Sequence, residues 1–219
     1  MKKKNKLNEW GYPLLTPLMR LLFRLWYNPK IVGKEYIPKE GPIIIAGNHK
    51  HLYDQCLAIM ATKRNIHYMA KKEYFEGKLA WFFRLVGCIP VDRESDDDVS
   101  KEIAIGVLNN KGAIGIFPEG TRNKTYDKLL LPLKYGTVSM SYKTGAFIIP
   151  CAVTGDYEFR SKNLMIRFGT PFRVEDDDYA KYNEMLREDI ESLIKENLNY
   201  TNRTMDEELQ SRNQDTKSN

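Results

Sequence analysis

The stretch NHKHLYD, residues 48–54, carries the residue types in this chain that are best suited to acid–base chemistry. Two of the three histidines, His49 and His51, lie in it, and Asp54 follows His49 by five positions. A neutral imidazole can take a proton from a hydroxyl through one nitrogen if its other nitrogen, as N–H, is held by a partner. A carboxylate is a good partner because it fixes the tautomer and stabilises the imidazolium. A turn between His49 and Asp54 would therefore make His49 a candidate general base.

A second polar segment, EGTR at residues 119–122, follows an apolar run. Gly120 allows a ligand to approach the backbone closely, and Thr121 and Arg122 supply a hydroxyl and a planar guanidinium suited to phosphate. The same residues also fit a tight turn capped by Thr121, with Glu119 and Arg122 paired in solvent. Composition leaves both interpretations open.

A third segment, GCIPVDR at residues 87–93, ends with another cation, Arg93. If this segment is a strand that ends at the same edge of a sheet, Arg93 would add a second positive charge to the site. The alternative is an ion pair of Arg93 with Asp92 or with the acidic run at residues 96–98, which itself fits a solvated helix start.

Short apolar runs alternate along the chain with stretches of helical pattern. The runs are too short for buried helices and predict strands, at residues 42–47, 65–70, 87–92, 112–117, 146–153 and 164–169. The stretches between them predict helices, at residues 54–62, 73–86, 97–110 and 133–145, with a last helix over about 178–199. This alternation predicts an α/β fold, a mostly parallel sheet flanked by helices, whose site lies at the carboxyl ends of the strands.

Residues 14–27, LLTPLMRLLFRLWY, predict an amphipathic helix over 17–27 with Thr16 as its cap. Arg20 and Arg24 would share a narrow stripe with Thr16, and leucines would cover the broad remainder. Eleven residues span roughly 16 Å, about half the hydrocarbon thickness of a bilayer. The helix is too short to cross a membrane, but it can lie in the interface or pack on its own domain.

The positive charge of the chain is concentrated near its N-terminus. Residues 1–40 contain nine Lys or Arg against three Glu, whereas the whole chain has a net charge of +5. A basic segment attracts either nucleic acid or an anionic membrane surface. Because the arginines of the N-terminal helix are interleaved with leucines rather than with polar base-reading residues, the pattern favours the membrane and argues against nucleic acid.

The N-terminus MKKKNK resembles the start of a signal peptide, but arginines interrupt the apolar stretch and no A-x-A cleavage site follows. The three cysteines lie in apolar surroundings and predict reduced core thiols in a cytoplasmic protein. We expect a basic, amphipathic membrane-association segment at 1–29, one α/β domain at 30–200 and a disordered polar tail at 201–219.

The blocks NHKHLYD, GCIPVDR, FPEGTRN and IIPCAV, in this order, resemble the sequence blocks of the glycerolipid acyltransferases, especially the bacterial 1-acylglycerol-3-phosphate acyltransferases. The resemblance covers about residues 30–175, and LKYG at residues 133–136 adds to it. It implies that His49 and Asp54 are the catalytic pair. It also implies that the acceptor's glycerol phosphate is held by Arg93, Glu119, Gly120, Thr121 and Arg122.

His51 departs from the resemblance, because relatives commonly carry a small hydroxyl residue such as Ser at this position. We interpret His51 and His67 as structural or surface imidazoles. The departure leaves open a minor role for His51 or a different acceptor.

The resemblance implies an O-acyltransferase that moves a fatty acyl chain from acyl-CoA or acyl carrier protein to the free hydroxyl of 1-acylglycerol 3-phosphate. No cofactor, metal or acyl-enzyme is expected, and the expected location is the cytoplasmic face of the cell membrane, as a peripheral or monotopic protein on anionic lipids. Close alternatives are acylation of another lysophospholipid acceptor or of glycerol 3-phosphate. Alternatives of other classes are a metal-dependent hydrolase with His49, His51 and Asp54 as ligands, and a non-catalytic lipid-binding scaffold.

Overall fold

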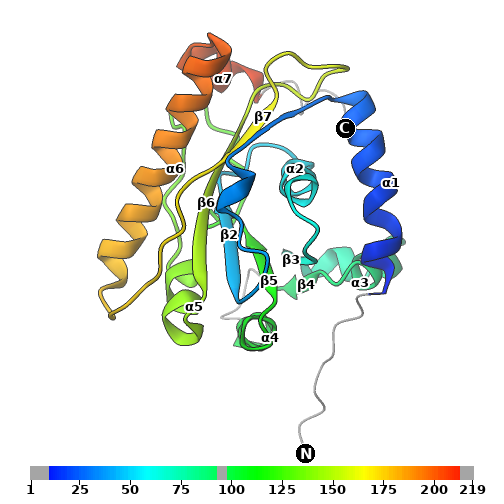
Figure 1. Ribbon diagram of the computed structural model, residues 1–219, viewed down its shortest axis with the longest axis vertical. Coiled ribbons are helices and arrows are strands. Elements are labelled where there is room, and N and C mark those ends of the chain that lie inside the picture. The colour runs from blue at the N-terminus through cyan, green and yellow to red at the C-terminus, as the bar shows by residue number, and fades with distance from the viewer. Residues whose placement is uncertain (1–9, 93–97, 213–219) are drawn as a thin grey trace, which may run out of the picture.

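The computed structural model describes residues 10–92 and 98–212, and a seven-stranded sheet forms its centre (Figure 1). The strand order is β1-β7-β6-β2-β5-β3-β4, and every neighbouring pair is parallel except β6 and β7. The strands are β1 (Lys30–Val32), β2 (Ile43–Gly47), β3 (Ile66–Lys71), β4 (Ile89–Val91), β5 (Ala113–Ile116), β6 (Phe147–Thr154) and β7 (Met165–Phe168). The predicted α/β fold with a mostly parallel sheet is confirmed. The short edge strand β1 was not predicted.

Helices cover both faces of the sheet (Figure 1). One face packs against α2, with α1 beyond it, and the other packs against α4, α5 and α6. The helices are α1 (Gly11–Trp26), α2 (Asp54–Ala61), α3 (Ala80–Leu85), α4 (Asp98–Asn109), α5 (Gly136–Thr144), α6 (Tyr179–Thr201) and α7 (Met205–Ser211), with 3₁₀ turns at Lys34–Tyr36 and Lys72–Phe75. The single helix predicted over 73–86 is therefore divided into a 3₁₀ turn and α3, with Gly77 in the break.

All five residues of β2 are buried because both faces of this strand are covered. Alternate side chains of a strand point to opposite faces. Ile43 and Ile45 accordingly pack in one cluster with Leu57 of α2, and Ile44 packs in another with Leu108 of α4. β2 lies between β5 and β6 and runs parallel to both. Its carboxyl end therefore lies between the carboxyl ends of these two strands.

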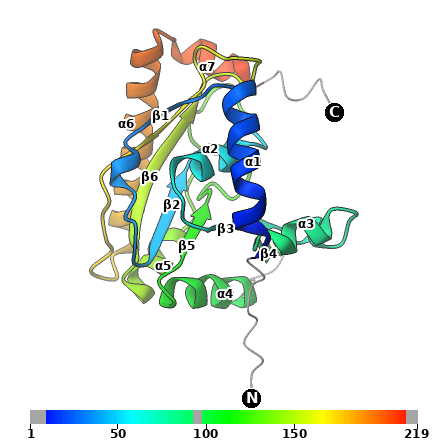
Figure 2. The ribbon, with the colours of Figure 1, turned by 45° about the vertical axis from the view of Figure 1, so that its right-hand side comes forward.

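Helix α1 lies at the surface of the molecule, beside α2 (Figure 2). Its packed side combines arginines with the aromatic residues Tyr12 and Phe23. Arg20 donates to the carbonyls of Ile59 and Thr62 at the end of α2, and Arg24 donates to the carbonyl of Pro29. The exposed face is formed by large apolar side chains, namely Leu14, Leu18, Leu21, Leu22, Leu25 and Trp26. This reverses the usual arrangement, in which a surface helix buries its apolar stripe.

The predicted start of this helix is wrong. α1 begins at Gly11, and Thr16, which was predicted to cap it, is a buried residue inside it. Pro13 lies in the first turn, where a missing N–H costs little, so the helix extends back to include it. Among the described residues, no helix is long and apolar enough to cross a membrane.

The predicted disordered tail is wrong for residues 201–212, which complete α6 and form α7. Thr204 caps α7 through a capping box, in which its hydroxyl accepts from the N–H of Glu207 and the Glu207 carboxylate accepts from the N–H of Thr204. Glu208 and Arg212 are buried. The low apolar content of this segment predicted disorder. Its polar side chains are nevertheless buried, because Glu208 pairs with Lys50 and Arg212 donates to the carbonyl of Lys128. Residues 213–219 lie outside the described residues.

Candidate active site

Three loops meet at the carboxyl end of the sheet, after β2, β5 and β6. They are residues 48–53, 117–123 and 155–157. The three strands are parallel neighbours, so their ends lie side by side, as the sequence predicted for the site of an α/β sheet.

Two asparagines fasten these loops to one another. The amide of Asn48 donates to the carbonyl of Val153 at 2.9 Å and accepts from the Val153 N–H at 2.8 Å, which ties the end of β2 to β6. The N–H of Asn123 donates to the carbonyl of His49 at 2.7 Å. Both asparagines are almost fully buried, and neither was predicted as a site residue.

The structure brings His49 and Asp54 together. Nδ1 of His49 lies 2.8 Å from Oδ2 of Asp54. The turn that the five-residue spacing requires is closed by the N–H of Asp54, which donates to the carbonyl of His51 at 3.3 Å. The His49 ring stacks on Phe117 of the next loop, with 3.9 Å between ring centroids and 5° between ring planes. The imidazole is thus held by ring stacking on one face as well as by the hydrogen bond at Nδ1.

The carboxylate of Asp54 is 1% exposed and accepts four hydrogen bonds. Oδ2 accepts from His49 and from the backbone N–H groups of Lys50 and His51, and Oδ1 accepts from the hydroxyl of Tyr157, each at 2.8 Å. Burial raises the pKa of Asp54, but these hydrogen bonds outweigh it and hold the pKa below its ordinary value. Asp54 is therefore ionised at neutral pH.

An ionised Asp54 decides which nitrogen of His49 carries the proton. Nδ1 must donate to the carboxylate, so Nε2 of the neutral ring has a free lone pair. Within the described residues, Nε2 has no hydrogen-bond partner. The His49 side chain is 13% exposed, so this nitrogen is the part of the pair that can meet a substrate.

Glu119 is buried, and its carboxylate accepts from the backbone of the loop that carries His49 rather than pairing with Arg122. Its Oε1 accepts from the backbone N–H of His49 at 2.7 Å, and its Oε2 accepts from the N–H of Leu131 at 2.8 Å. Burial raises the pKa of Glu119 to about 7, against the opposing effect of the two N–H groups and of Arg212. Glu119 thus shapes the loop that carries His49, and its contact with the acceptor stays a prediction.

Gly120, Thr121 and Arg122 follow on the same loop. Gly120 has φ +72°, and a Cβ at this position would lie 2.8 Å from Cε of Lys134, so the loop requires glycine here. Thr121 is exposed, and Arg122 is half-exposed with no hydrogen-bond partner in the ranges that the structure describes. Lys134, from the LKYG segment, adds a cation beside Gly120. Arg93 lies outside the described residues.

Tyr157 is a site residue that sequence reasoning missed. Besides donating to Asp54, its ring stacks on His51, with 3.9 Å between centroids and 19° between planes. Nδ1 of His51 accepts from the N–H of Tyr53 at 3.1 Å, as expected for a structural imidazole. Tyr157 is more than one hundred residues from Asp54 in sequence. Its position just after a strand was the one available signal.

The residues do not form the metal site that the hydrolase alternative requires. Among the described residues, no group of three or more His, Cys, Asp and Glu side chains is placed to hold a metal ion. The oxygens of Asp54 already accept from N–H and O–H donors, and His51 stacks on Tyr157 instead of converging with His49. This geometry argues against His49, His51 and Asp54 as a ligand set.

Comparison with known proteins adds an independent observation. Residues 28–154 match the family model described as Acyltransferase. The 1-acyl-sn-glycerol-3-phosphate acyltransferase of Bacillus subtilis is 29% identical over 188 residues, covering 83% of this chain and 92% of that protein. The protein of the same name from Borreliella burgdorferi is 30% identical over 174 residues, covering 77% and 69%. The crystal structure of the 1-acyl-sn-glycerophosphate acyltransferase PlsC from Thermotoga maritima superimposes with a TM-score of 0.68 at 20% identity, covering 84% of this chain and 78% of that one, and shares the fold.

Proposed function

This chain belongs to the acyltransferase family, and we propose that it transfers a fatty acyl chain from acyl-CoA or acyl carrier protein to the free hydroxyl of 1-acylglycerol 3-phosphate, forming phosphatidic acid. The observation that carries the proposal is the His49–Asp54 pair, in which Asp54 is ionised and Nε2 of His49 is left as an acceptor. The names of the two bacterial relatives support this choice of acceptor.

The proposed mechanism uses His49 as a general base. Nε2 takes the proton of the acceptor hydroxyl while its oxygen attacks the thioester carbonyl carbon, and Asp54 stabilises the imidazolium that forms. The tetrahedral intermediate then collapses, the C–S bond breaks, and the leaving thiolate takes the proton back from Nε2. Both substrates occupy the site together, so no acyl-enzyme forms. General base catalysis of this type contributes about 10²- to 10⁴-fold.

Cations at the edge of the site are proposed to hold the acceptor phosphate. Lys134 lies beside Gly120, Arg122 follows Gly120 by two residues on the same loop, and a guanidinium can bind phosphate oxygens in a bidentate manner. Arg93 remains a proposed contact on sequence grounds. Positioning of the acceptor hydroxyl against the thioester is expected to supply a large part of the rate, in addition to proton transfer.

The outward apolar face of α1 supports the proposal that the protein lies on the cytoplasmic face of the cell membrane. Exposed leucine and tryptophan side chains are suited to the interface of a bilayer, and the basic N-terminal residues of the chain would meet anionic headgroups. Helix α3 adds the exposed apolar side chains of Trp81 and Phe82, and Leu79 just before it is also exposed. Leu85 of α3 lies against Gly11 at the start of α1.

The same surface reaches the catalytic loop. Leu52 and Tyr53 are exposed, and the Tyr53 ring is 5.7 Å from that of Phe23 on α1. A lysophospholipid held in the bilayer would therefore need to move only a short way to reach His49. This path is part of the proposal and explains why an acyltransferase of a membrane lipid would have α1 in this orientation.

A panel of lyso-acceptors tests the function. Purified protein is offered 1-acylglycerol 3-phosphate, other lysophospholipids and glycerol 3-phosphate, each with acyl-CoA and with acyl carrier protein. We expect transfer to 1-acylglycerol 3-phosphate, and a fall of about 10²- to 10⁴-fold in kcat for His49→Ala. Thermal melting of the variant shows whether its fold is retained.

Each alternative has its own outcome in this panel. Preference for another acceptor would replace the proposed substrate while keeping the reaction. Activity that a strong chelator abolishes would favour the metal-dependent hydrolase, and equal activity of the parent and His49→Ala would contradict the role of His49. Binding of lipid without turnover under any condition would favour the scaffold.

A further inference from the structure

The C-terminal helix α7 reaches the catalytic loop through a buried ion pair between Glu208 and Lys50. We propose that Glu208 is a positioning residue for acyl transfer, because it holds the two segments that donate to the two oxygens of Asp54. Its kinetic test rests on the function proposed above, whereas its effect on the geometry of His49 and Asp54 can be measured without any substrate.

Lys50 connects Asp54 to α7 from within the catalytic loop. Its backbone N–H donates to Oδ2 of Asp54 at 2.8 Å. Its side chain is 4% exposed and extends away from Asp54, so that Nζ donates to Glu208, to the carbonyl of Gly155 at 2.8 Å and to the hydroxyl of Ser211 at 3.1 Å. All three protons of the ammonium are used. A displacement of Nζ would be transmitted to the backbone that holds Asp54.

Glu208 joins Lys50 to the turn that follows β6. One carboxylate oxygen accepts from Nζ of Lys50, and the other accepts from the N–H of Gly155 at 2.9 Å. The Glu208 side chain is 1% exposed. Because Gly155 also accepts from Lys50, the three residues form a closed ring of hydrogen bonds.

The turn held by this ring carries Tyr157, two residues after Gly155. The hydroxyl of Tyr157 donates to Oδ1 of Asp54 at 2.8 Å. Glu208 is therefore linked to Oδ2 of Asp54 through Lys50 and to Oδ1 through the turn. Orientation of Asp54 in turn sets the position of the His49 ring.

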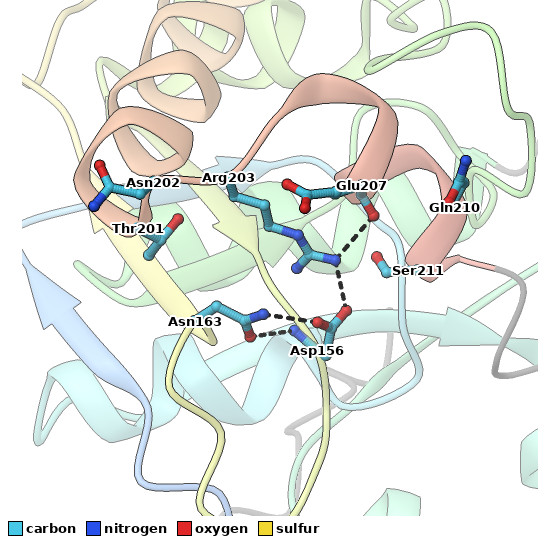
Figure 3. A pocket seen from close by; sticks show the side chains of 8 residues that line it. All are labelled: Asp156, Asn163, Thr201, Asn202, Arg203, Glu207, Gln210 and Ser211. Carbon is cyan, nitrogen blue, oxygen red and sulfur yellow. Dashed lines mark hydrogen bonds and ion pairs between the residues drawn. The ribbon is translucent and has the colours of Figure 1, made fainter.

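Asp156, which lies between Gly155 and Tyr157 in sequence, is bound by Asn163 and Arg203 (Figure 3). Its carboxylate accepts from Asn163 at 2.7 Å and from Arg203 at 2.9 Å, and the Arg203 guanidinium also lies 3.3 Å from Glu208. These residues border a polar pocket of about 640 Å³, lined by Asp156, Asn163, Thr201, Asn202, Arg203, Glu207, Gln210 and Ser211. The C-terminal residues thus form a polar support behind the catalytic loop.

A purely structural ion pair would behave differently from a positioning pair. Apolar side chains of similar size can replace a buried ion pair with little loss of stability, whereas removing one partner leaves an unpaired charge. Apolar replacements cannot donate to or accept from Gly155. They also leave Arg203 without the Glu208 carboxylate. They should therefore restore only part of the stability that a single substitution removes, and they should not restore the geometry of the turn.

The test uses variants of the full chain, Lys50→Met, Glu208→Gln and the double variant Lys50→Met/Glu208→Leu. Glu207→Gln is the matched control, because Glu207 is the exposed neighbour on α7 and a glutamine can still serve the capping box. Three quantities are measured for each variant: the melting temperature, kcat with the acceptor KM, and the NMR shift of the proton between His49 Nδ1 and Asp54.

We expect Glu208→Gln to lower kcat by about 10- to 100-fold with acceptor KM unchanged, because a small misplacement of the base affects the transition state. The double variant should regain part of the melting temperature that Lys50→Met loses, but neither the parent's kcat nor its Nδ1 proton shift, and Glu207→Gln should match the parent throughout. A double variant with the parent's kcat and proton shift would overturn the proposal. If the parent transfers no acyl group, the proposed function fails, and the Nδ1 proton shift still decides the role of Glu208.

Discussion

Asp54 shows how a carboxylate can be ionised while it is almost completely buried. Burial alone would favour the neutral acid. Four donors to the two oxygens stabilise the charged form by more than the loss of hydration destabilises it. Three of the donors come from residues 49–51, so the loop after β2 is folded around the carboxylate. Because the ionised Asp54 accepts from Nδ1, Nε2 is the unprotonated nitrogen of the neutral His49 ring.

Glu119 gives a prediction for the pH dependence of stability. Its pKa is about 7 in the folded protein, compared with about 4.3 in an unfolded chain. Between these values the folded state binds the proton more tightly, so the stability due to this group is present at low pH and is lost as pH rises through 7. Between pH 5 and pH 8 this loss corresponds to about 2–3 kcal/mol.

We expect Glu119→Gln to remove that component. The free energy of unfolding of the parent should fall by about 2–3 kcal/mol more than that of the variant between pH 5 and pH 8, measured by urea denaturation. The variant is expected to be less stable at pH 5, because its amide N–H₂ faces the N–H of either His49 or Leu131. Parallel pH curves for the two proteins would show that Glu119 titrates normally.

At the scale of elements, α1 is unusual because its arginines contact the domain and its leucines are exposed. Its arginines reach the carbonyls at the end of α2, which are unpaired within their own helix, and this leaves the leucine face in solvent. Burying one such leucine is worth about 1.5–3 kcal/mol. A partner surface that covers the whole face would therefore gain substantial free energy, and the proposed partner is the bilayer.

This orientation predicts the effect of polar substitutions on α1. We expect the triple variant Leu18→Gln/Leu21→Gln/Leu25→Gln to lose binding to anionic vesicles by more than tenfold, because three exposed apolar contacts with the bilayer are removed. Its melting temperature should stay near that of the parent, since these side chains face away from the domain. Vesicle co-sedimentation and thermal melting measure the two quantities.

A matched control substitutes an exposed apolar residue elsewhere, Val99→Gln on α4. This variant should bind vesicles as the parent does. Equal binding by the triple variant and the parent would contradict membrane docking through α1, and a large fall in melting temperature would instead indicate that the leucines pack on the protein.

At the scale of the whole molecule, the three cysteines lie on different elements: Cys56 on α2, Cys88 just before β4 and Cys151 on β6. Burial raises the pKa of the thiols of Cys56, Cys88 and Cys151 to about 12. At pH 8 only about one thiol in 10⁴ would be ionised, and the thiolate is the reactive form. Cys151 is buried as predicted, whereas Cys56 and Cys88 are only partly buried. The low ionised fraction makes thiol reactivity a measure of protein opening.

We expect the three thiols to react slowly with a thiol reagent at pH 8 in the native protein and rapidly in denaturant. The native rate should rise with urea in parallel with unfolding measured by circular dichroism. Rapid labelling of one cysteine in the native state would instead identify a thiol that is accessible without unfolding, and mass spectrometry of the labelled peptides would locate it.

Sequence patterns predicted the sheet well because each strand carries its own signal. A run such as residues 42–47 is apolar enough to be buried on both faces, which is typical of a central parallel strand. The pair His49 and Asp54 was likewise visible, since both residues lie in one short segment. β1 has only three residues, at the sheet edge, and so carried too little pattern to be recognised.

The sequence by itself determined the fold class, the order of the strands along the chain and the local pair at the site. Only the tertiary structure decided which face of α1 is exposed, that residues 201–212 are ordered, and that Tyr157, Lys50 and Glu208 support Asp54. The physical reason is that periodicity reports burial of apolar side chains within one element. Buried polar pairs such as Lys50 with Glu208 join residues far apart in sequence, and their pairing exists only when the strands have brought both partners to the same edge of the sheet.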